Sequence, residues 1–197
     1  MFSRDSFRAP LAVVLVTLAL ASPAQAGLSK KEATPDERRG QVREMRDETL
    51  KKLYKVQPAA RKQIEAAAGY AVFSNFGMKI LVAGGGSGSG IVVDNATGRE
   101  TFMKMAEIQA GLGLGVKKFR LVWVFERKAD VDGFANSGWE VGAQSTASAK
   151  LDDKGAEAFT GAVSVTPGVW LYQLTDDSLA LELTAKGTRY YRDADLN

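Results

Sequence analysis

Basic side chains beside glycine-rich segments are the residues of this chain best suited to bind a ligand. Gly111, Gly113 and Gly115 alternate with large apolar residues, so a strand here would carry bare backbone on one face. Bare backbone beside clustered cations could receive an anionic head group or a phosphate. The alternative is ordinary edge-strand lysine, which discourages aggregation. The candidate cations of these segments are Lys79, Lys104, Lys117, Lys118 and Arg120.

Most catalytic chemistry is excluded because the sequence contains neither His nor Cys. Their absence removes Ser-His-Asp and Cys-His pairs, disulfides, the usual structural zinc sites and an axial haem His. The carboxylate pairs Asp152-Asp153 and Asp176-Asp177 lie beside turn signals, where solvated Asp is expected for backbone reasons. A hydrolase built on these pairs, or on Ser87 or Ser89, would lack a visible base. We therefore predict a non-enzymatic protein with no catalytic residue, no metal and no cofactor.

The glycine run from Gly84 to Gly90 does not fit a nucleotide site. A P-loop needs Lys directly after its last glycine, and none of these glycines is followed by Lys. The run leads into the apolar Ile91-Val92-Val93, which predicts a strand, whereas a phosphate-binding loop leads into a helix. Close backbone packing is the better interpretation. A nucleic-acid partner is also disfavoured, because the net charge is only +3.

The first 26 residues have the order of a secretory signal peptide. Arg4 and Arg8 precede an apolar run from Leu11 to Ala21, and an A-x-A pattern ends at Ala26. The apolar run is about half of the ~20 residues that a membrane span requires. We expect an exported, periplasmic protein that can associate peripherally with a membrane. It would have a flexible leader over residues 27–33 and a single domain over residues 34–197.

The stretch Thr34-Pro35-Asp36-Glu37 predicts the start of a long helix with a capping box. A narrow apolar stripe at helical spacing follows, and the other faces are rich in basic residues. The stripe consists of Val42, Met45, Thr49, Leu53 and Val56, and the basic faces include Arg38, Arg39, Arg43 and Arg46. A basic amphipathic helix can lie on an anionic membrane. So narrow a stripe favours packing on the protein's own domain instead.

The remaining sequence predicts an α+β fold, with N-terminal helices packed on a mostly antiparallel, glycine-rich sheet for which a barrel-like arrangement is one option. Pro58 to Ala68 and Arg127 to Asn136 predict short helices. We expect turns at Ser74–Gly77, at Asp94–Gly98 and at the basic residues 117–120, which would close a hairpin onto the strand 121–125. Further strands are expected at Tyr70–Phe73, Met78–Ala83, Trp139–Ala149, Ala162–Val165, Val169–Leu174, Leu179–Ala185 and Thr188–Arg192.

Taken together, these segments resemble the SYLF domain family of lipid-binding and actin-binding proteins, and look closest to its secreted bacterial members. The residues that carry the resemblance are Gly69 to Phe73 with Asn75 and Lys79, Gly84 to Gly90, Gly111 to Gly115, Phe125, Phe134, Gly138-Trp139, Gly142, Tyr172 to Thr175 and Gly187 to Tyr191. One departure is Ser74, where the family commonly has Pro. The resemblance implies a non-enzymatic domain that binds phospholipids, partly through basic N-terminal residues.

The sequence therefore predicts a secreted domain that binds anionic phospholipid head groups at a membrane surface. Head-group contact is assigned to Lys79, Lys104, Lys117, Lys118 and Arg120, supported by Arg38, Arg39, Arg43 and Arg46 on the first helix. The alternative is an interaction or scaffold module of the cell envelope that binds a protein partner without direct lipid binding. Neither alternative involves nucleic acid or nucleotide.

Overall fold

The computed structural model describes residues 33–80, 83–110, 115–141, 159–175, 179–180 and 187–197. The signal-peptide prediction, most of the strand expected at Trp139–Ala149 and both Asp-Asp turns lie outside these ranges. The helices are α1 (Pro35–Val56), α2 (Ala60–Ala66) and α3 (Lys128–Ser137). The strands are β1 (Gly69–Ile80), β2 (Ala83–Asp94), β3 (Glu100–Ala110), β4 (Gly115–Phe125), β5 (Trp139–Val141), β6 (Val163–Thr166), β7 (Val169–Leu174), β8 (Leu179–Ala180) and β9 (Thr188–Arg192).

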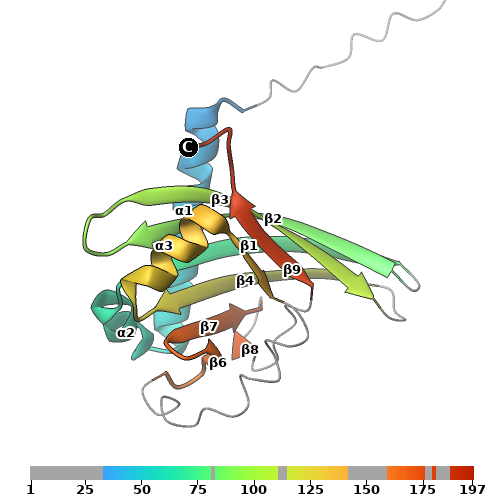
Figure 1. The fold of residues 1–197 in the computed structure, drawn as a ribbon. Coiled ribbons are helices and arrows are strands. Elements are labelled where there is room, and N and C mark those ends of the chain that lie inside the picture. The colour runs from blue at the N-terminus through green and yellow to red at the C-terminus, as the bar shows by residue number, and fades with distance from the viewer. Residues whose placement is uncertain (1–32, 81–82, 111–114, 142–158, 176–178, 181–186) are drawn as a thin grey trace, which may run out of the picture. The chain divides into compact units, whose positions relative to one another are not determined.

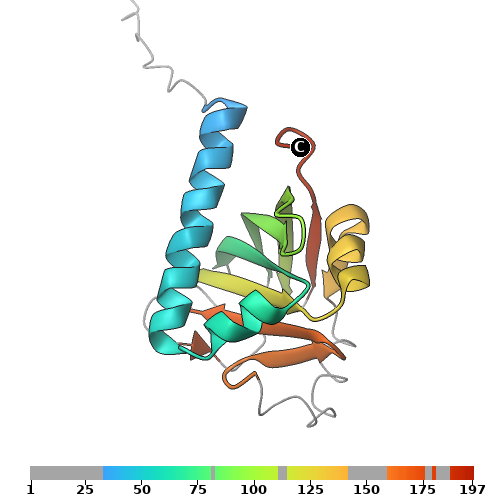
Figure 2. The same ribbon diagram turned by 90° about the vertical axis from the view of Figure 1, so that its left-hand side faces the viewer.

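The strands form one curled antiparallel sheet in the order β5-β9-β3-β2-β1-β4-β7-β6, with β8 paired to β7 (Figure 1). Helices α1 and α2 cover one face of this sheet, called the α1 face, and α3 covers the other, called the α3 face (Figure 2). Among the described residues, the sheet path begins at β5 and ends at β6, so the curl stays open. The predicted α+β fold is confirmed.

The central strands are buried on both faces, which explains their continuous apolar runs. In β4, Leu121, Trp123 and Phe125 pack on the α3 face, whereas Val122 and Val124 pack beneath α1 and α2. All five side chains are 0% exposed. A strand covered on one face would alternate apolar and polar residues, so burial on both faces accounts for the continuous apolar run.

Strand β2 presents glycine instead of side chains to the α3 face at Gly86, Gly88 and Gly90. The Phe73 ring fills the space over Gly90, and the Met105 side chain fills the space over Gly88. Next to them, the Asn75 amide from β1 donates to the buried Glu107 carboxylate from β3 across the intervening strand, at 2.6 Å. The glycine run therefore serves close packing, as the sequence predicted.

Two predicted turns are wrong. Strand β1 runs unbroken through Ser74–Gly77, because each of these residues pairs with both β2 and β4. The basic residues 117–120 likewise lie inside β4, paired with β1, and no turn occurs there. Local turn propensity at these positions is overridden by pairing with long neighbouring strands.

Helix α1 packs on the sheet and begins as predicted. Thr34 accepts a hydrogen bond from the Glu37 backbone N–H at 3.3 Å, and the Glu37 carboxylate accepts one from the Thr34 N–H at 2.7 Å. Val42, Thr49 and Leu53 of the predicted stripe are buried, whereas Val56 at the end of the helix is 41% exposed. The stripe therefore faces the domain, as its narrowness indicated.

The β2–β3 turn is fixed by the buried carboxylate of Asp94. Its Oδ1 accepts hydrogen bonds from the backbone N–H groups of Ala96 and Thr97, each at 3.0 Å. Its Oδ2 lies 3.0 Å from the Lys128 ammonium on α3. The Lys128 ammonium, followed by the Thr97 N–H, lowers the pKa of Asp94 from 3.8 to about 2.

Substituting Gly90 by Ala should destabilise the fold by about 1–3 kcal/mol, because the new Cβ would overlap the Phe73 ring and the Val72 carbonyl oxygen. Gly85→Ala is the matched control, since a Cβ there would meet only the Glu107 carbonyl oxygen, at an ordinary 3.5 Å. Urea unfolding followed by circular dichroism measures both changes. Equal stability of the two variants would contradict the packing account of β2.

The ionised Asp94 should stabilise the fold at neutral pH and lose this effect in acid. Its pKa is lowered on folding, so the contribution is complete above pH ~4 and disappears as the pH falls toward 2. The stability difference between the wild type and Asp94→Asn should therefore be constant from about pH 5 to 7 and shrink between about pH 4 and 2. Urea unfolding across this pH range is the measurement, and a difference that does not vary with pH would refute the assignment.

Candidate functional site

Three of the predicted head-group cations on α1 are held by hydrogen bonds and ion pairs to other parts of the domain. Arg43 and Arg46 both bind the Glu100 carboxylate on β3, each at 2.7 Å. Arg39 donates to the backbone oxygen of Leu196 at 2.9 Å and to Asp36 at 2.6 Å. These arginines fasten α1 to the sheet and to the C-terminal segment, so their main visible role is structural.

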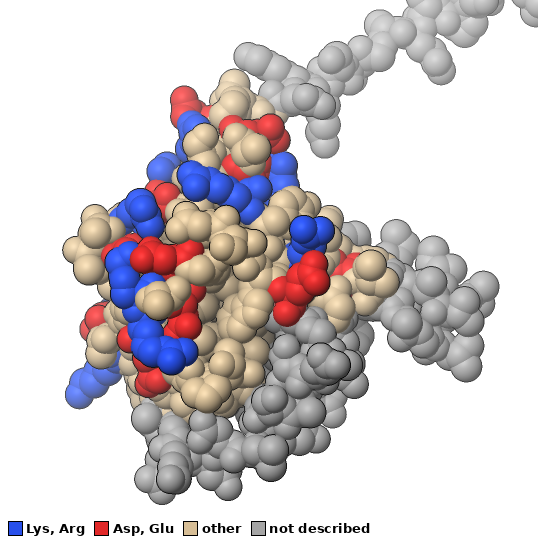
Figure 3. Space-filling model, viewed as in Figure 1, with Lys and Arg blue, Asp and Glu red and all other residues tan. Residues whose placement is uncertain are grey.

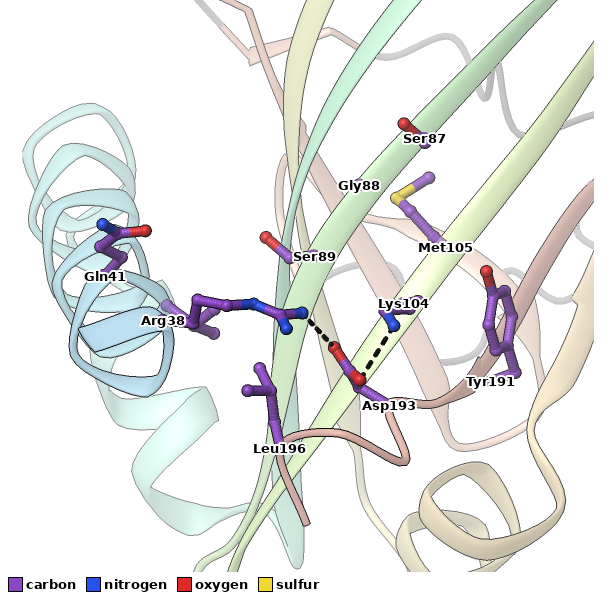
Figure 4. A pocket seen from close by; sticks show the side chains of 11 residues that line it. Arg38, Gln41, Ser87, Gly88, Ser89, Lys104, Met105, Tyr191, Asp193 and Leu196 are labelled. Atoms are coloured by element: carbon purple, nitrogen blue, oxygen red, sulfur yellow. Dashed lines mark hydrogen bonds and ion pairs between the residues drawn. The ribbon is translucent and has the colours of Figure 1, made fainter. Parts of the chain in front are cut away.

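A hollow of about 430 Å³ lies between the N-terminal half of α1, strands β2 and β3, and the C-terminal segment (Figure 4). We call it the Asp193 hollow. Two predicted cations, Arg38 and Lys104, point into it from opposite walls. Its lining residues are Arg38, Gln41, Val42, Ser87, Gly88, Ser89, Lys104, Met105, Tyr191, Asp193 and Leu196.

The buried carboxylate of Asp193 organises the charges of this hollow. It lies 3.2 Å from the Arg38 guanidinium and 3.0 Å from the Lys104 ammonium. Lys104 is also 3.1 Å from the exposed carboxylate of Asp195. Hydrogen bonds to Asp193 and then to Asp195 raise the pKa of Lys104, so this side chain stays charged. The cations of the hollow are thus held in fixed positions by carboxylates.

A second hollow, of about 240 Å³, lies beside the C-terminal half of α1. We call it the Arg120 hollow, and it brings together two predicted cations, Lys118 and Arg120, with Lys52 from α1. Its lining residues are Lys52, Ser74, Asn75, Lys118, Phe119, Arg120, Leu174 and Thr175.

Helix α1 positions Arg120 within this hollow. The Arg120 guanidinium donates to the Thr49 hydroxyl at 2.9 Å and to the Met45 carbonyl oxygen at 3.4 Å. The Glu48 carboxylate accepts a further bond at 3.2 Å. On the same helix, the Lys52 ammonium donates to the Thr175 carbonyl oxygen at 2.7 Å. The cations of this hollow are therefore also placed by hydrogen bonds to the protein.

The remaining predicted cations, Lys79 and Lys117, lie on the neighbouring strands β1 and β4. Lys117 on β4 is the backbone partner of Gly77 on β1, and Lys79 on β1 is the partner of Gly115 on β4. Their side chains lie outside the described part of the structure. The backbone register nevertheless brings Lys79, Lys117 and Lys118 to the same end of the β1–β4 pair.

The charges on the opposite side of the molecule are mixed. Figure 3 shows the α3 face, where Lys and Arg alternate with Asp and Glu over the described residues. At the start of α3, for example, Lys128 lies 2.6 Å from Asp132, and the N-cap residue Arg127 lies 2.7 Å from Asp130. The two hollows on the α1 face each bring two or more cations together, which makes them the candidates for binding an anion.

Sequence reasoning missed three contributors to the hollows. Lys52 was one of several helix cations, and only the direction of α1 on the sheet places it beside Arg120. Tyr191 and Asp193 belong to the end of the chain and reach the Asp193 hollow through the pairing of β9 with β3. The basic faces of the helix could have indicated Lys52 as a site residue, whereas no local pattern in the sequence indicated Asp193.

The described residues show no arrangement that would indicate a metal centre. In these ranges, no three His, Cys, Asp or Glu side chains gather closely enough to hold a metal ion. None of the helices in the described ranges is both long and apolar enough to cross a membrane. What the site offers chemically is fixed positive charge and hydroxyl groups, which suit binding.

Comparison with known proteins identifies a bacterial relative. The chain is 31% identical over 163 residues to beta cell expansion factor A from Aeromonas veronii. The match covers 83% of this chain and 60% of that protein, so the chain spans about three fifths of the relative's length. The relative's name mentions no ligand and no reaction. No protein-family model matches the chain.

Replacing Asp193 by Asn should destabilise the fold, because Arg38 and Lys104 would lose their buried counter-charge. Breaking a fully buried pair costs roughly 3–5 kcal/mol, but both cations are about one third exposed, so we expect about 1–3 kcal/mol. The matched control is Asp195→Asn, whose carboxylate is 63% exposed and should contribute under about 1 kcal/mol. Urea unfolding measures both variants. A loss for Asp193→Asn no larger than that for Asp195→Asn would show that the buried counter-charge does not stabilise the fold.

Proposed function

We propose that this chain is a SYLF-type domain that binds anionic phospholipid at a membrane surface and catalyses no reaction. The observation that carries the proposal is the Arg120 hollow, where Lys52, Lys118 and Arg120 converge from a helix and a strand. The resemblance of the sequence to the SYLF family supports it. Guanidinium and ammonium groups held close together are suited to a phosphate.

The size and setting of this hollow agree with a head-group site. A volume of about 240 Å³ suits a phosphate head group and leaves lipid tails outside. The serine hydroxyl of Ser74 lines the same hollow and offers a further hydrogen bond.

In this proposal, the predicted cations have two different roles. Lys118 and Arg120, with Lys52, contact the head group. Arg39, Arg43 and Arg46 hold α1 in place and contribute to binding only through the position of the helix. The signal-peptide pattern supports export, so the membrane would be met from the periplasm.

The purified protein from Gly27 to Asn197 should cosediment with phosphatidylcholine vesicles that contain phosphatidylglycerol, and should leave pure phosphatidylcholine vesicles unbound. Each cation near an anionic surface contributes about 1 kcal/mol, so Lys118→Glu should weaken binding roughly 5- to 30-fold. Raising the salt from about 0.1 M to about 1 M shortens the Debye length from about 10 Å to about 3 Å and should release the protein.

Arg99→Glu is the control for charge, since Arg99 lies in the β2–β3 turn with its side chain 55% exposed and pairs with Asp132 at 3.3 Å. It should bind vesicles nearly as well as the wild type. Unchanged binding by Lys118→Glu would remove the Arg120 hollow as the site. Absence of binding to both kinds of vesicle would sink the lipid proposal and favour a protein partner in the cell envelope.

A further inference from the structure

A row of four polar residues crosses the α1 face of the sheet and joins the two hollows. Lys104 on β3 is the backbone partner of Ser89 on β2, Ser89 is the partner of Ser74 on β1, and Ser74 is the partner of Arg120 on β4. Ser89 lines the Asp193 hollow and its backbone partner Ser74 lines the Arg120 hollow, so the two hollows lie on neighbouring strands. At about 4.8 Å per strand, Lys104 and Arg120 are about 14 Å apart along the backbone row.

Helix α1 runs beside this row of sheet residues along its whole length. Residues three or four apart lie on the same side of a helix, and this spacing holds for Arg38, Gln41, Met45, Glu48 and Lys52. The first two line the Asp193 hollow, the last lines the Arg120 hollow, and the middle two contact Arg120. The two hollows therefore follow one another along the same side of α1, and together we call them the α1 furrow.

The α1 furrow has positive charge at both ends and hydroxyl groups in the middle. Arg38 and Lys104 stand at one end and are 36% and 35% exposed, and Arg120 stands at the other end, 33% exposed. Between the two ends, the small side chains of Ser74 and Ser89 leave space above the sheet. A furrow of this kind fits a ligand with two separated anionic groups joined by a polar linker.

The carboxylates near the furrow leave room for such a ligand. Asp193 is buried and fixes the two cations at its end, which reduces the cost of ordering them when a ligand binds. Asp195 and Glu48 are 63% and 59% exposed, so these two side chains can turn into solvent and give their places to phosphate oxygens. One exposed, replaceable carboxylate therefore stands at each end.

We propose that the α1 furrow binds a lipid head group that carries two phosphates joined through a hydroxylated linker, with one phosphate at each end. This inference rests on the proposed function and narrows its ligand. A lipid with a single phosphate occupies one end only, and the cations at the other end stay paired with their carboxylates. Two phosphates on one molecule engage both ends, and the second contact forms at high effective concentration.

Cardiolipin, two phosphates bridged by glycerol, is the probe. Phosphatidylcholine vesicles containing either cardiolipin or phosphatidylglycerol, matched in anionic phosphate, are titrated with the protein from Gly27 to Asn197. We expect the cardiolipin vesicles to bind at least about tenfold more tightly. Equal binding to the two lipids would overturn the inference and leave the proposed function standing, whereas binding to neither would overturn both.

Substitutions at the two ends and in the middle test the furrow itself. Lys104→Gln and Arg120→Gln should each abolish the preference for cardiolipin, because either change leaves one end without its cation. Ser89→Leu fills the space between the ends without changing any charge and should also abolish the preference. Glu48→Gln and Asp195→Asn should instead strengthen cardiolipin binding about 2- to 5-fold, since they remove the competing carboxylates.

Circular dichroism and urea unfolding show whether each variant is folded, and Arg99→Gln is the surface control that should retain the preference. The opposite effects of Arg120→Gln and Glu48→Gln, which change the two partners of one ion pair, separate ligand contact from general loss of structure.

If Ser89→Leu and both end variants fold and keep the cardiolipin preference, the furrow does not bind this head group. A soluble glycerol-bridged bisphosphate that displaces the protein from vesicles would locate recognition in the head group, and failure to compete would contradict the assignment.

Discussion

The packing of this domain depends on the absence of side chains from the α3 face of strand β2. Because Gly88 and Gly90 carry no side chain, Met105 and Phe73 from the neighbouring strands close over β2, and the Asn75 amide meets the Glu107 carboxylate across it. The sheet can then curl around a core shared by β1, β3 and β4. A Cβ at either glycine would push these groups apart, so the curl and the core have a common cause.

Charge in this molecule first holds the structure together. Arg43 and Arg46 fasten the middle of α1 to Glu100, while Asp193 links Arg38 to Lys104 near the C-terminus. Helix α1 buries only a narrow apolar stripe, so these ion pairs and the small core beneath it together set its direction on the sheet. That direction is what creates the two hollows along one side of the helix.

The arrangement suits binding through fixed charge. The hollows offer guanidinium, ammonium and hydroxyl groups held by the protein before any ligand arrives, which is the preorganisation that recognition of an anion requires. The whole chain lacks His and Cys, the side chains that most often transfer protons or act as nucleophiles near neutral pH. A binding domain for an anionic surface is consistent with both facts.

Local signals in the sequence were sufficient for much of the fold. The capping box at Thr34, the narrow stripe of α1 and the strand at 121–125 were predicted correctly, since each depends on residues that are close in the chain. The turns expected at Ser74–Gly77 and at residues 117–120 were wrong, because pairing with distant strands outweighs local turn preference.

The basic residues of the candidate site were visible in the sequence, but their grouping was decided only by the tertiary structure. Ser74, Ser89, Lys104 and Arg120 become neighbours through the register of four strands, and a shift of one residue would turn each of them to the other face. The pairing of Asp193 with Arg38 joins residues 155 positions apart. Composition and periodicity fix which residues are available, whereas register and helix direction fix which of them meet.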